Sequence, residues 1–141
     1  MRKSDEEGII SMKEGPLKIL VVDDDFLDRK MLAEFLKDIS ICDFAVNGQE
    51  AILAMQAASS SENRYDLILI DYEMPELNGM EFVKKIRDDE TKSGTLFGKG
   101  IPIIMITAHR EIFMKAFRYG VNDYILKPIS IHDVLGKIAA L

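Results

Sequence analysis

The feature that most constrains the fold of this sequence is a series of short apolar runs separated by longer amphipathic segments. Four of these runs occupy residues 19–22, 67–70, 103–106 and 124–126. Runs this short and this rich in branched side chains are typical of strands that are buried on both faces. Because helical segments alternate with them, the pattern predicts an α/β fold with a parallel sheet covered by helices on both sides.

Five strand–helix units can be delimited from this alternation. Strands are expected at residues 17–22, 41–46, 65–70, 101–106 and 123–126. Helices are expected at residues 26–37, from the N-cap Asn47 to before Ser59, from the end of a loop at residues 71–79 to about residue 87, at 110–119 and at 131–141. Right-handed crossovers around a central first strand then predict the order 2-1-3-4-5, a doubly wound, flavodoxin-like (βα)5 sheet.

Three segments carry further expectations. Residues 1–15 are predicted to be a flexible N-terminal leader, so that the folded domain comprises residues 16–141. Residues 88–100, with three glycines and mixed charges, are predicted to form an unusually long connection. The first helix is expected to bury one face that includes Phe26, Met31 and Leu32.

Composition excludes several classes of function. A chain of 141 residues accommodates one domain, and its net charge of −6 argues against non-specific binding to nucleic acid or to an anionic membrane. No apolar run approaches the roughly 18 residues of a membrane helix, and the charged N-terminus is unlike a signal peptide, so a cytoplasmic location is expected. The single cysteine, Cys42, is expected to be an inert strand residue.

Polar residues of different chemical types stand where the apolar runs end. The triplet Asp23-Asp24-Asp25 follows the first predicted strand, Asp71 the third, Thr107 the fourth and Lys127 the fifth. The carboxyl ends of parallel strands meet at one edge of a sheet, so these side chains are expected to converge. Several carboxylates, a hydroxyl and an ammonium together suit a divalent cation such as Mg²⁺ and a phosphoryl group beside it.

Each of these residues also has a purely structural interpretation. Asp25 is expected to cap the first helix, and Thr107 to cap the fourth helix while it also serves the site. Asp71 alone would be an ordinary turn residue ahead of Met74-Pro75, and Tyr124 and Phe117 would be packing aromatics. The match in position among the four strand ends favours a functional site for Asp71.

The same residues resemble the receiver domain of two-component response regulators, the CheY-like superfamily. The resemblance covers residues 17–141, and its most specific stretches are residues 19–25, 69–75 with Gly79, 106–108 and 123–128. It implies that Asp71 is the phosphoryl acceptor and that Lys127 and the Ala108 amide contact the phosphoryl group. It further implies that Asp23, Asp24, Asp71 and the Glu73 carbonyl hold Mg²⁺ or Mn²⁺, and that Thr107 and Tyr124 form an activation switch.

This resemblance implies a phosphorelay function. The donor would be a histidine kinase or a histidine phosphotransfer protein, and the domain would phosphorylate itself and slowly lose the phosphate. The surface formed by the fourth helix (residues 110–119), the fifth strand (123–126) and the fifth helix (131–141) would then act on a downstream effector protein or domain, with phosphorylation-dependent homodimers as a further expectation. The chain would be stand-alone or part of a larger regulator or hybrid kinase, without direct contact to nucleic acid or membrane.

Two positions are left open by the resemblance. Glu73 and His109 each lie two residues beyond a site residue, Asp71 and Thr107 respectively. Both side chains can reach the path of a hydrolytic water and tune the lifetime of the phosphate. Equally, both can be solvated loop residues.

Three other classes of protein share parts of the pattern. A haloacid-dehalogenase-like phosphatase with an aspartate nucleophile would use Asp23 of the triplet together with Thr107. This alternative leaves Asp71 unexplained, and Phe26-Leu27 stand where it expects a small polar or β-branched residue. A flavodoxin binds a phosphate group in the loop after the first strand, but three aspartates in this loop would repel the phosphate. A receiver-like interaction module that is not phosphorylated would not need the full set of acids, threonine and lysine.

Overall fold

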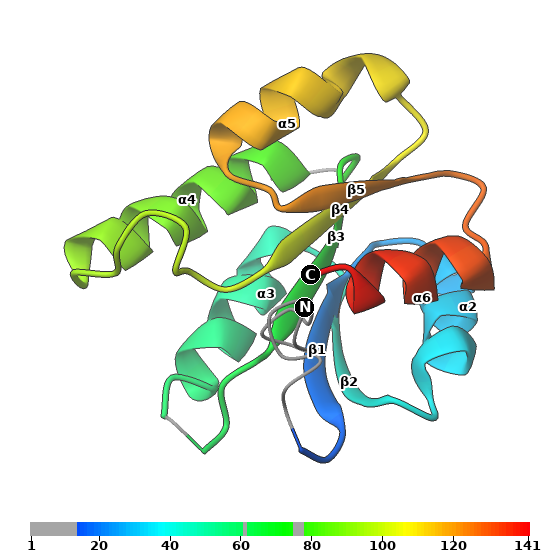
Figure 1. The fold of residues 1–141 in the computed structure, drawn as a ribbon, viewed down its shortest axis with the longest axis horizontal. Coiled ribbons are helices and arrows are strands. Elements are labelled where there is room, and N and C mark those ends of the chain that lie inside the picture. Colours follow the sequence, from blue (N-terminus) through cyan, green and yellow to red (C-terminus); the bar gives the residue numbers. More distant parts are fainter. Residues whose placement is uncertain (1–13, 61, 75–77) are drawn as a thin grey trace, which may run out of the picture.

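Five parallel strands form the central layer of the structure, a computed structural model that describes residues 14–60, 62–74 and 78–141 (Figure 1). The strands are β1 (Leu17–Val22), β2 (Ser40–Ala45), β3 (Leu67–Asp71), β4 (Ile103–Thr107) and β5 (Asp123–Leu126). Their order is β2-β1-β3-β4-β5, and every neighbouring pair is parallel. This confirms the predicted order and the flavodoxin-like class.

Helices cover both faces of the sheet. They are α2 (Phe26–Leu36), α3 (Gly48–Ala57), α4 (Gly79–Lys92), the 3-10 turn η2 (Arg110–Ile112) continued by α5 (Phe113–Tyr119), and α6 (Ile131–Ala139). α2 and α6 lie on one side of the sheet, and α3, α4 and α5 lie on the other (Figure 1). Within the described part of the chain, no helix is long and apolar enough to cross a membrane.

Alternate residues of the strands pack into two separate hydrophobic cores, one on each face of the sheet. Leu20, Ile68 and Met105 pack on the side of α3, α4 and α5, whereas Ile19, Leu69 and Ile104 pack on the side of α2 and α6. Each such side chain contributes about 1.5 to 3 kcal/mol when it is fully buried. The central strands are therefore anchored on both faces, which fixes the residues at their carboxyl ends.

Helix caps agree in part with the sequence expectations. The Asp25 carboxylate accepts a hydrogen bond from Asp28 N at 3.0 Å, and the Asn47 side chain accepts one from Glu50 N at 2.8 Å. Both predicted N-caps are confirmed. Thr107 is not an N-cap: η2 begins after His109, and the Thr107 hydroxyl instead accepts a hydrogen bond from His109 N at 2.9 Å.

The predicted long connection was too long, because α4 extends to Lys92 and the irregular segment begins only at Ser93. Polar contacts rather than apolar packing support this last part of α4. Arg87 Nη1 lies 2.7 Å from Glu90 Oε1, and Glu90 Oε2 accepts a hydrogen bond from Ile101 N at 2.7 Å. A search for an apolar stripe therefore ends the helix too early.

Several other expectations about elements were wrong in detail. Phe26 and Met31 are 59% and 37% exposed, and Leu32 and Leu36 alone are fully buried in α2. The Phe26 ring instead lies beside the cations of Arg29 and Lys30. Element boundaries shift by one or two residues, the fourth helix opens with the 3-10 turn, and α6 ends at Ala139. Residues 1–13 of the predicted leader lie outside the described residues.

Candidate functional site

The carboxyl edge of the sheet gathers the polar residues that the sequence places after its strands. Asp23 follows β1, Asp71 and Thr107 are the last residues of β3 and β4, and Lys127 follows β5. An open cleft at this edge is lined by Asp24, Asp25, Asp28, Asp71, Tyr72, Glu73, Met74, Asn78 and Lys127. Strands that are held on both faces thus deliver acids and a lysine to one place.

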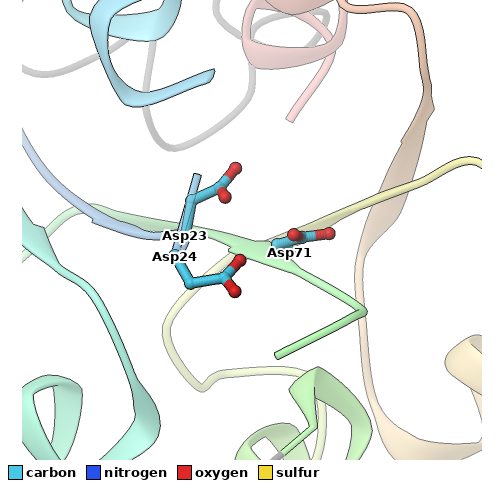
Figure 2. A group of neighbouring side chains, drawn as sticks. All are labelled: Asp23, Asp24 and Asp71. Carbon is cyan, nitrogen blue, oxygen red and sulfur yellow. The ribbon is translucent and has the colours of Figure 1, made fainter. Parts of the chain in front are cut away.

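Three carboxylates form a cluster at this edge of the sheet. Asp23, Asp24 and Asp71 each offer one oxygen, and these oxygens all lie within 4.8 Å of one another (Figure 2). Asp23 and Asp71 are only 0% and 3% exposed, whereas Asp24 is exposed. Like charges this close repel one another unless a proton or a cation intervenes.

Asp23 is the most perturbed acid of the cluster. Its Oδ1 accepts a hydrogen bond from Asp25 N at 2.9 Å, whereas its buried Oδ2 has no hydrogen-bond partner among the described residues. Burial, helped by the charges of Asp71 and Asp28, raises the pKa of the Asp23 carboxyl to about 7. A buried oxygen without a donor fits a cation ligand, since hard cations prefer carboxylate oxygens.

Asp71 lies between this cluster and Lys127. Its Oδ1 is 3.3 Å from Lys127 Nζ and accepts a hydrogen bond of 3.3 Å from Glu73 N. Burial raises the pKa of the Asp71 carboxyl above its usual range, and the nearby Lys127 ammonium opposes this shift. The ammonium therefore favours the ionised form of Asp71, which is the form that can act as a nucleophile.

Lys127 is held by two acids and by the backbone. Its ammonium lies 3.3 Å from Asp28 Oδ2 as well as 3.3 Å from Asp71, and Lys127 N donates to Thr107 O at 2.8 Å. Burial lowers the pKa of Lys127, but the charges of Asp71 and Asp28 outweigh it and leave the pKa raised. The Lys127-Pro128 peptide bond is cis.

Asp28 is a site residue that sequence reasoning missed. It lies in the first turn of α2, three residues after the capping Asp25, where an acid is explained by the helix dipole alone. The available signal was its spacing, because one helical turn beyond the triplet places it above the same cleft.

The two residues expected to form the switch have different partners. Thr107 is 1% exposed, and its hydroxyl bonds to the backbone of His109. The Tyr124 ring stacks on Phe113 with ring centroids 3.4 Å apart, and Phe117 meets it edge-on at 6.1 Å. The packing expected of Tyr124 and Phe117 is thus observed. Ala108, which directly follows β4, is exposed.

Glu73 and His109, which the sequence treats as separate loop residues, are paired with each other. His109 Nε2 contacts Glu73 Oε1, and His109 Nδ1 lies 3.3 Å from Glu111 Oε1. The His109 ring also meets Tyr72 edge-on, with centroids 6.2 Å apart. This pair joins the segments that follow β3 and β4 at the rim of the cleft, a tertiary contact that has no sequence signal.

Gly79, the first residue of α4, permits a close approach to the backbone at Asp71. A Cβ at this position would clash with the Asp71 carbonyl oxygen and lie 3.1 Å from Tyr72 Cα. Gly79→Ala is therefore expected to lower the free energy of unfolding by about 1 to 3 kcal/mol, measured by urea unfolding. Gly136→Ala in α6, where nothing lies within 4 Å of the new Cβ, should raise it by about 0.5 to 1 kcal/mol. Equal stability of the two variants would contradict the close approach.

Comparison with known proteins decides the family. The sequence profile described as the response regulator receiver domain matches residues 19–139. The chain belongs to the response regulator receiver domain family. This membership agrees with the resemblance of the motifs, and the haloacid-dehalogenase alternative is not favoured.

Transcriptional regulatory proteins are similar to most of this chain. Transcriptional regulatory protein ResD of Bacillus subtilis is 39% identical over 127 residues, which are 88% of this chain and 47% of ResD. The chain therefore spans about half the length of the curated relatives it matches.

Solved receiver domains share the fold. The receiver domain of Ssk1 from Saccharomyces cerevisiae, crystallised with the histidine phosphotransfer protein Ypd1, has a TM-score of 0.75 and 31% identity, covering 88% of this chain and 87% of that one. The receiver domain of the sensor histidine kinase PA1611 from Pseudomonas aeruginosa has a TM-score of 0.68 and 25% identity, covering 88% and 95%. In that structure a magnesium ion is coordinated in the active site cleft.

Proposed function

We propose that this receiver domain accepts a phosphoryl group on Asp71 from a phosphohistidine donor and thereby switches the surface formed by α5, β5 and α6. The observation that carries the proposal is the position of Asp71, whose carboxylate lies 3.3 Å from the Lys127 ammonium and beside two further acids. A carboxylate with a cation on one side and an acidic cluster on the other suits nucleophilic attack on phosphorus.

The transfer itself requires little covalent chemistry from the protein. An Asp71 oxygen attacks the phosphorus in line with the leaving imidazole, so that an O–P bond forms while the P–N bond of phosphohistidine breaks. The Lys127 ammonium and the Ala108 amide stabilise negative charge on the phosphoryl oxygens. Positioning and charge neutralisation supply most of the rate acceleration.

The acids fit a magnesium ion, or a manganese ion, on the chemistry of their oxygen atoms. Asp23, Asp24, Asp71 and the carbonyl of Glu73 would hold it, and the unpartnered Asp23 Oδ2 is consistent with such a ligand. When bound, the ion neutralises charge between the acids and the incoming phosphoryl group. The magnesium ion in the cleft of the similar PA1611 receiver supports this assignment.

The proposed switch uses Thr107 and Tyr124. The phosphate adds acceptor oxygens that draw in the Thr107 hydroxyl, which at present accepts from His109 N. This movement vacates space into which the Tyr124 ring can turn, and the ring then leaves its stack on Phe113. The surface of α5 and β5 changes as a result.

Lys127→Ala should slow phosphorylation without abolishing it. The variant loses one charge-assisted contact to the phosphoryl group, so labelling by a small phosphoryl donor is expected to slow about tenfold to a hundredfold. The β5 amide shifts caused by phosphorylation should shrink as well, as measured by NMR. Lys84→Ala, an exposed lysine of α4, is the control. If phosphorylation of Lys127→Ala shifts the β5 amides as much as in the wild type, this function of the lysine is refuted.

Glu73 and His109 are proposed to tune the phosphate lifetime together, since their pair covers the rim of the cleft. Glu73→Ala and His109→Ala should each shorten the half-life of the phosphate about threefold to tenfold, because water gains access. The double variant should be no faster than either single one. If the effects of the two substitutions on the hydrolysis rate are additive, the two residues act independently and not as a pair.

The partners follow from the donor chemistry and from the relatives. A histidine kinase or a histidine phosphotransfer protein is the proposed donor, as the complex of the Ssk1 receiver with Ypd1 suggests. The output is proposed to act on an effector protein or domain, with phosphorylation-dependent homodimerisation as one route. The chain would be stand-alone or part of a larger regulator or hybrid kinase, would work in the cytoplasm, and would phosphorylate itself and dephosphorylate slowly.

A titration with beryllofluoride and magnesium tests the proposed function, because this complex mimics a phosphoryl group on a carboxylate. The amides near Asp71, Thr107 and Tyr124 are expected to shift in the wild-type NMR spectrum and to stay unchanged in Asp71→Asn. An unresponsive wild-type protein would favour the alternative of an interaction module that is not phosphorylated.

A further inference from the structure

Lys137, in the last turn of α6, contacts the proposed switch residue from the side opposite α5. Its ammonium lies 4.7 Å from the centroid of the Tyr124 ring and 2.9 Å from Asp123 Oδ1. β5, which carries Tyr124, runs between α5 and α6 (Figure 1). The ring is thus held by two helices at once.

The arrangement around the Tyr124 ring leaves a distinct place for the ammonium. Phe113 stacks on the ring with centroids 3.4 Å apart and an angle of 23° between the planes. Since Phe113 occupies one face at this distance, the Lys137 ammonium has room only over the other face. Leaving this position costs the ring both an aromatic stack and a cation–π contact.

Asp123 fixes the ammonium in place. Its Oδ1 accepts from Lys137 Nζ at 2.9 Å and from Tyr124 N at 2.8 Å, so one carboxylate oxygen binds both the cation and the backbone of the aromatic residue. Lys137 and Asp123 are partly buried, with side-chain exposures of 35% and 25%. The ion pair with Asp123 therefore preorganises the partly buried ammonium over the ring.

We infer that Lys137 is a positioning residue that holds Tyr124 in the stacked orientation and so sets how readily the domain switches. Its effect on switching rests on the proposed function, whereas its effect on the ring does not. When Tyr124 turns toward the space beside Thr107, the ring leaves the ammonium. Removal of the cation is expected to shift the ratio of stacked to unstacked Tyr124 about twofold to fivefold toward unstacked.

The test compares variants that separate charge from bulk. Lys137→Met keeps the length of the side chain and removes the cation, whereas Lys137→Arg keeps a cation. Lys115→Met is the matched control, because Lys115 lies over the ring of Tyr119 at 5.8 Å, in an equivalent contact elsewhere on the surface. Should Lys137→Met fail to fold, Lys137→Gln carries the same expectation.

The first measurement is made on the unphosphorylated protein. Nuclear Overhauser contacts between the Tyr124 and Phe113 rings are expected to weaken in Lys137→Met, and to keep their wild-type intensity in Lys137→Arg and Lys115→Met. Wild-type intensity in Lys137→Met, or an equal loss in Lys115→Met, would overturn the inference.

The second measurement separates this inference from the proposed function. In a beryllofluoride and magnesium titration, Lys137→Met should reach half-saturation at about two- to fivefold lower concentration, because less stacking opposes the switch. If the wild type does not respond but Lys137→Met loses the stack, the proposed function fails and the positioning effect stands. If the wild type responds and Lys137→Met titrates and stacks like it, the inference fails alone.

Discussion

Asp71→Asn is expected to abolish phosphoryl labelling of this receiver domain, by at least about a thousandfold in rate. The amide nitrogen and oxygen of asparagine cannot replace a carboxylate oxygen as the attacking group. Asparagine nevertheless keeps an oxygen that can accept the hydrogen bond from Glu73 N, which spans 3.3 Å in the native chain. If labelling is lost while the structure is retained, the carboxylate oxygen itself is therefore required for the reaction. Labelling is measured with a radioactive small phosphoryl donor and magnesium.

The control for this variant is Asp38→Asn, which removes an exposed carboxylate in the turn after α2. It should label at the wild-type rate, and both variants should show cooperative thermal unfolding. Asp71→Asn should also be at least as stable as the wild type, because burial disfavours the native carboxylate. Labelling of Asp71→Asn at more than a few per cent of the wild-type rate would place the acceptor at another residue.

Asp23→Asn is expected to stabilise the metal-free protein at neutral pH by about 2 to 4 kcal/mol while it weakens magnesium binding at least about tenfold. The buried Asp23 carboxylate adds repulsion within the acidic cluster, and its Oδ2 has no hydrogen-bond donor among the described residues. Higher stability combined with weaker magnesium binding is expected when a residue serves ligand binding at the expense of stability. Urea unfolding without metal and a magnesium titration measure the two effects.

The pH dependence gives this second prediction its sign. The folded pKa of Asp23 is about 7, whereas an unfolded aspartate has a pKa of about 3.9. Between these values the folded state binds more protons than the unfolded state, so the free energy of unfolding of the metal-free protein decreases as the pH rises and levels off above about 7. Asp23→Asn should flatten this dependence. Magnesium should restore stability to the wild type above pH 7, where it replaces the proton.

Asp24→Asn separates metal binding from burial. Its carboxylate belongs to the same cluster but is exposed, so the variant should weaken magnesium binding and change stability by no more than about 0.5 kcal/mol. A wild-type pH dependence in Asp23→Asn, or a loss of stability in that variant without metal, would contradict the account of the acidic cluster.

The sheet and the positions of its functional residues could be predicted because they depend on local patterns. Apolar runs located the strands, crossover handedness limited their order, and the polar residues Asp71, Thr107 and Lys127 follow from where those runs end. Residues that lie far apart in the sequence thus meet for a topological reason, which a single sequence contains.

The remaining contacts depend on tertiary packing and could not be predicted. The Glu73–His109 pair joins two side chains whose neighbours in sequence give no hint of a partner. Helical spacing places Asp28 on the side of the acidic triplet, but it does not indicate Lys127 as the partner of Asp28. The extension of α4 depends on Glu90 reaching Ile101 N across an irregular segment. Phe26 is the first residue of α2 and is exposed, and helical periodicity alone does not specify whether a residue at the end of a helix is buried.

Covalent mapping of the phosphoryl group tests the central claim most directly. The protein is incubated with a small acyl phosphate and magnesium, the acyl phosphate formed is reduced with borohydride, and the modified aspartate is located by peptide mass spectrometry. The account predicts modification of Asp71 in the wild type and none in Asp71→Asn. Modification of Asp23, or an intact mass unchanged by the donor, would contradict it.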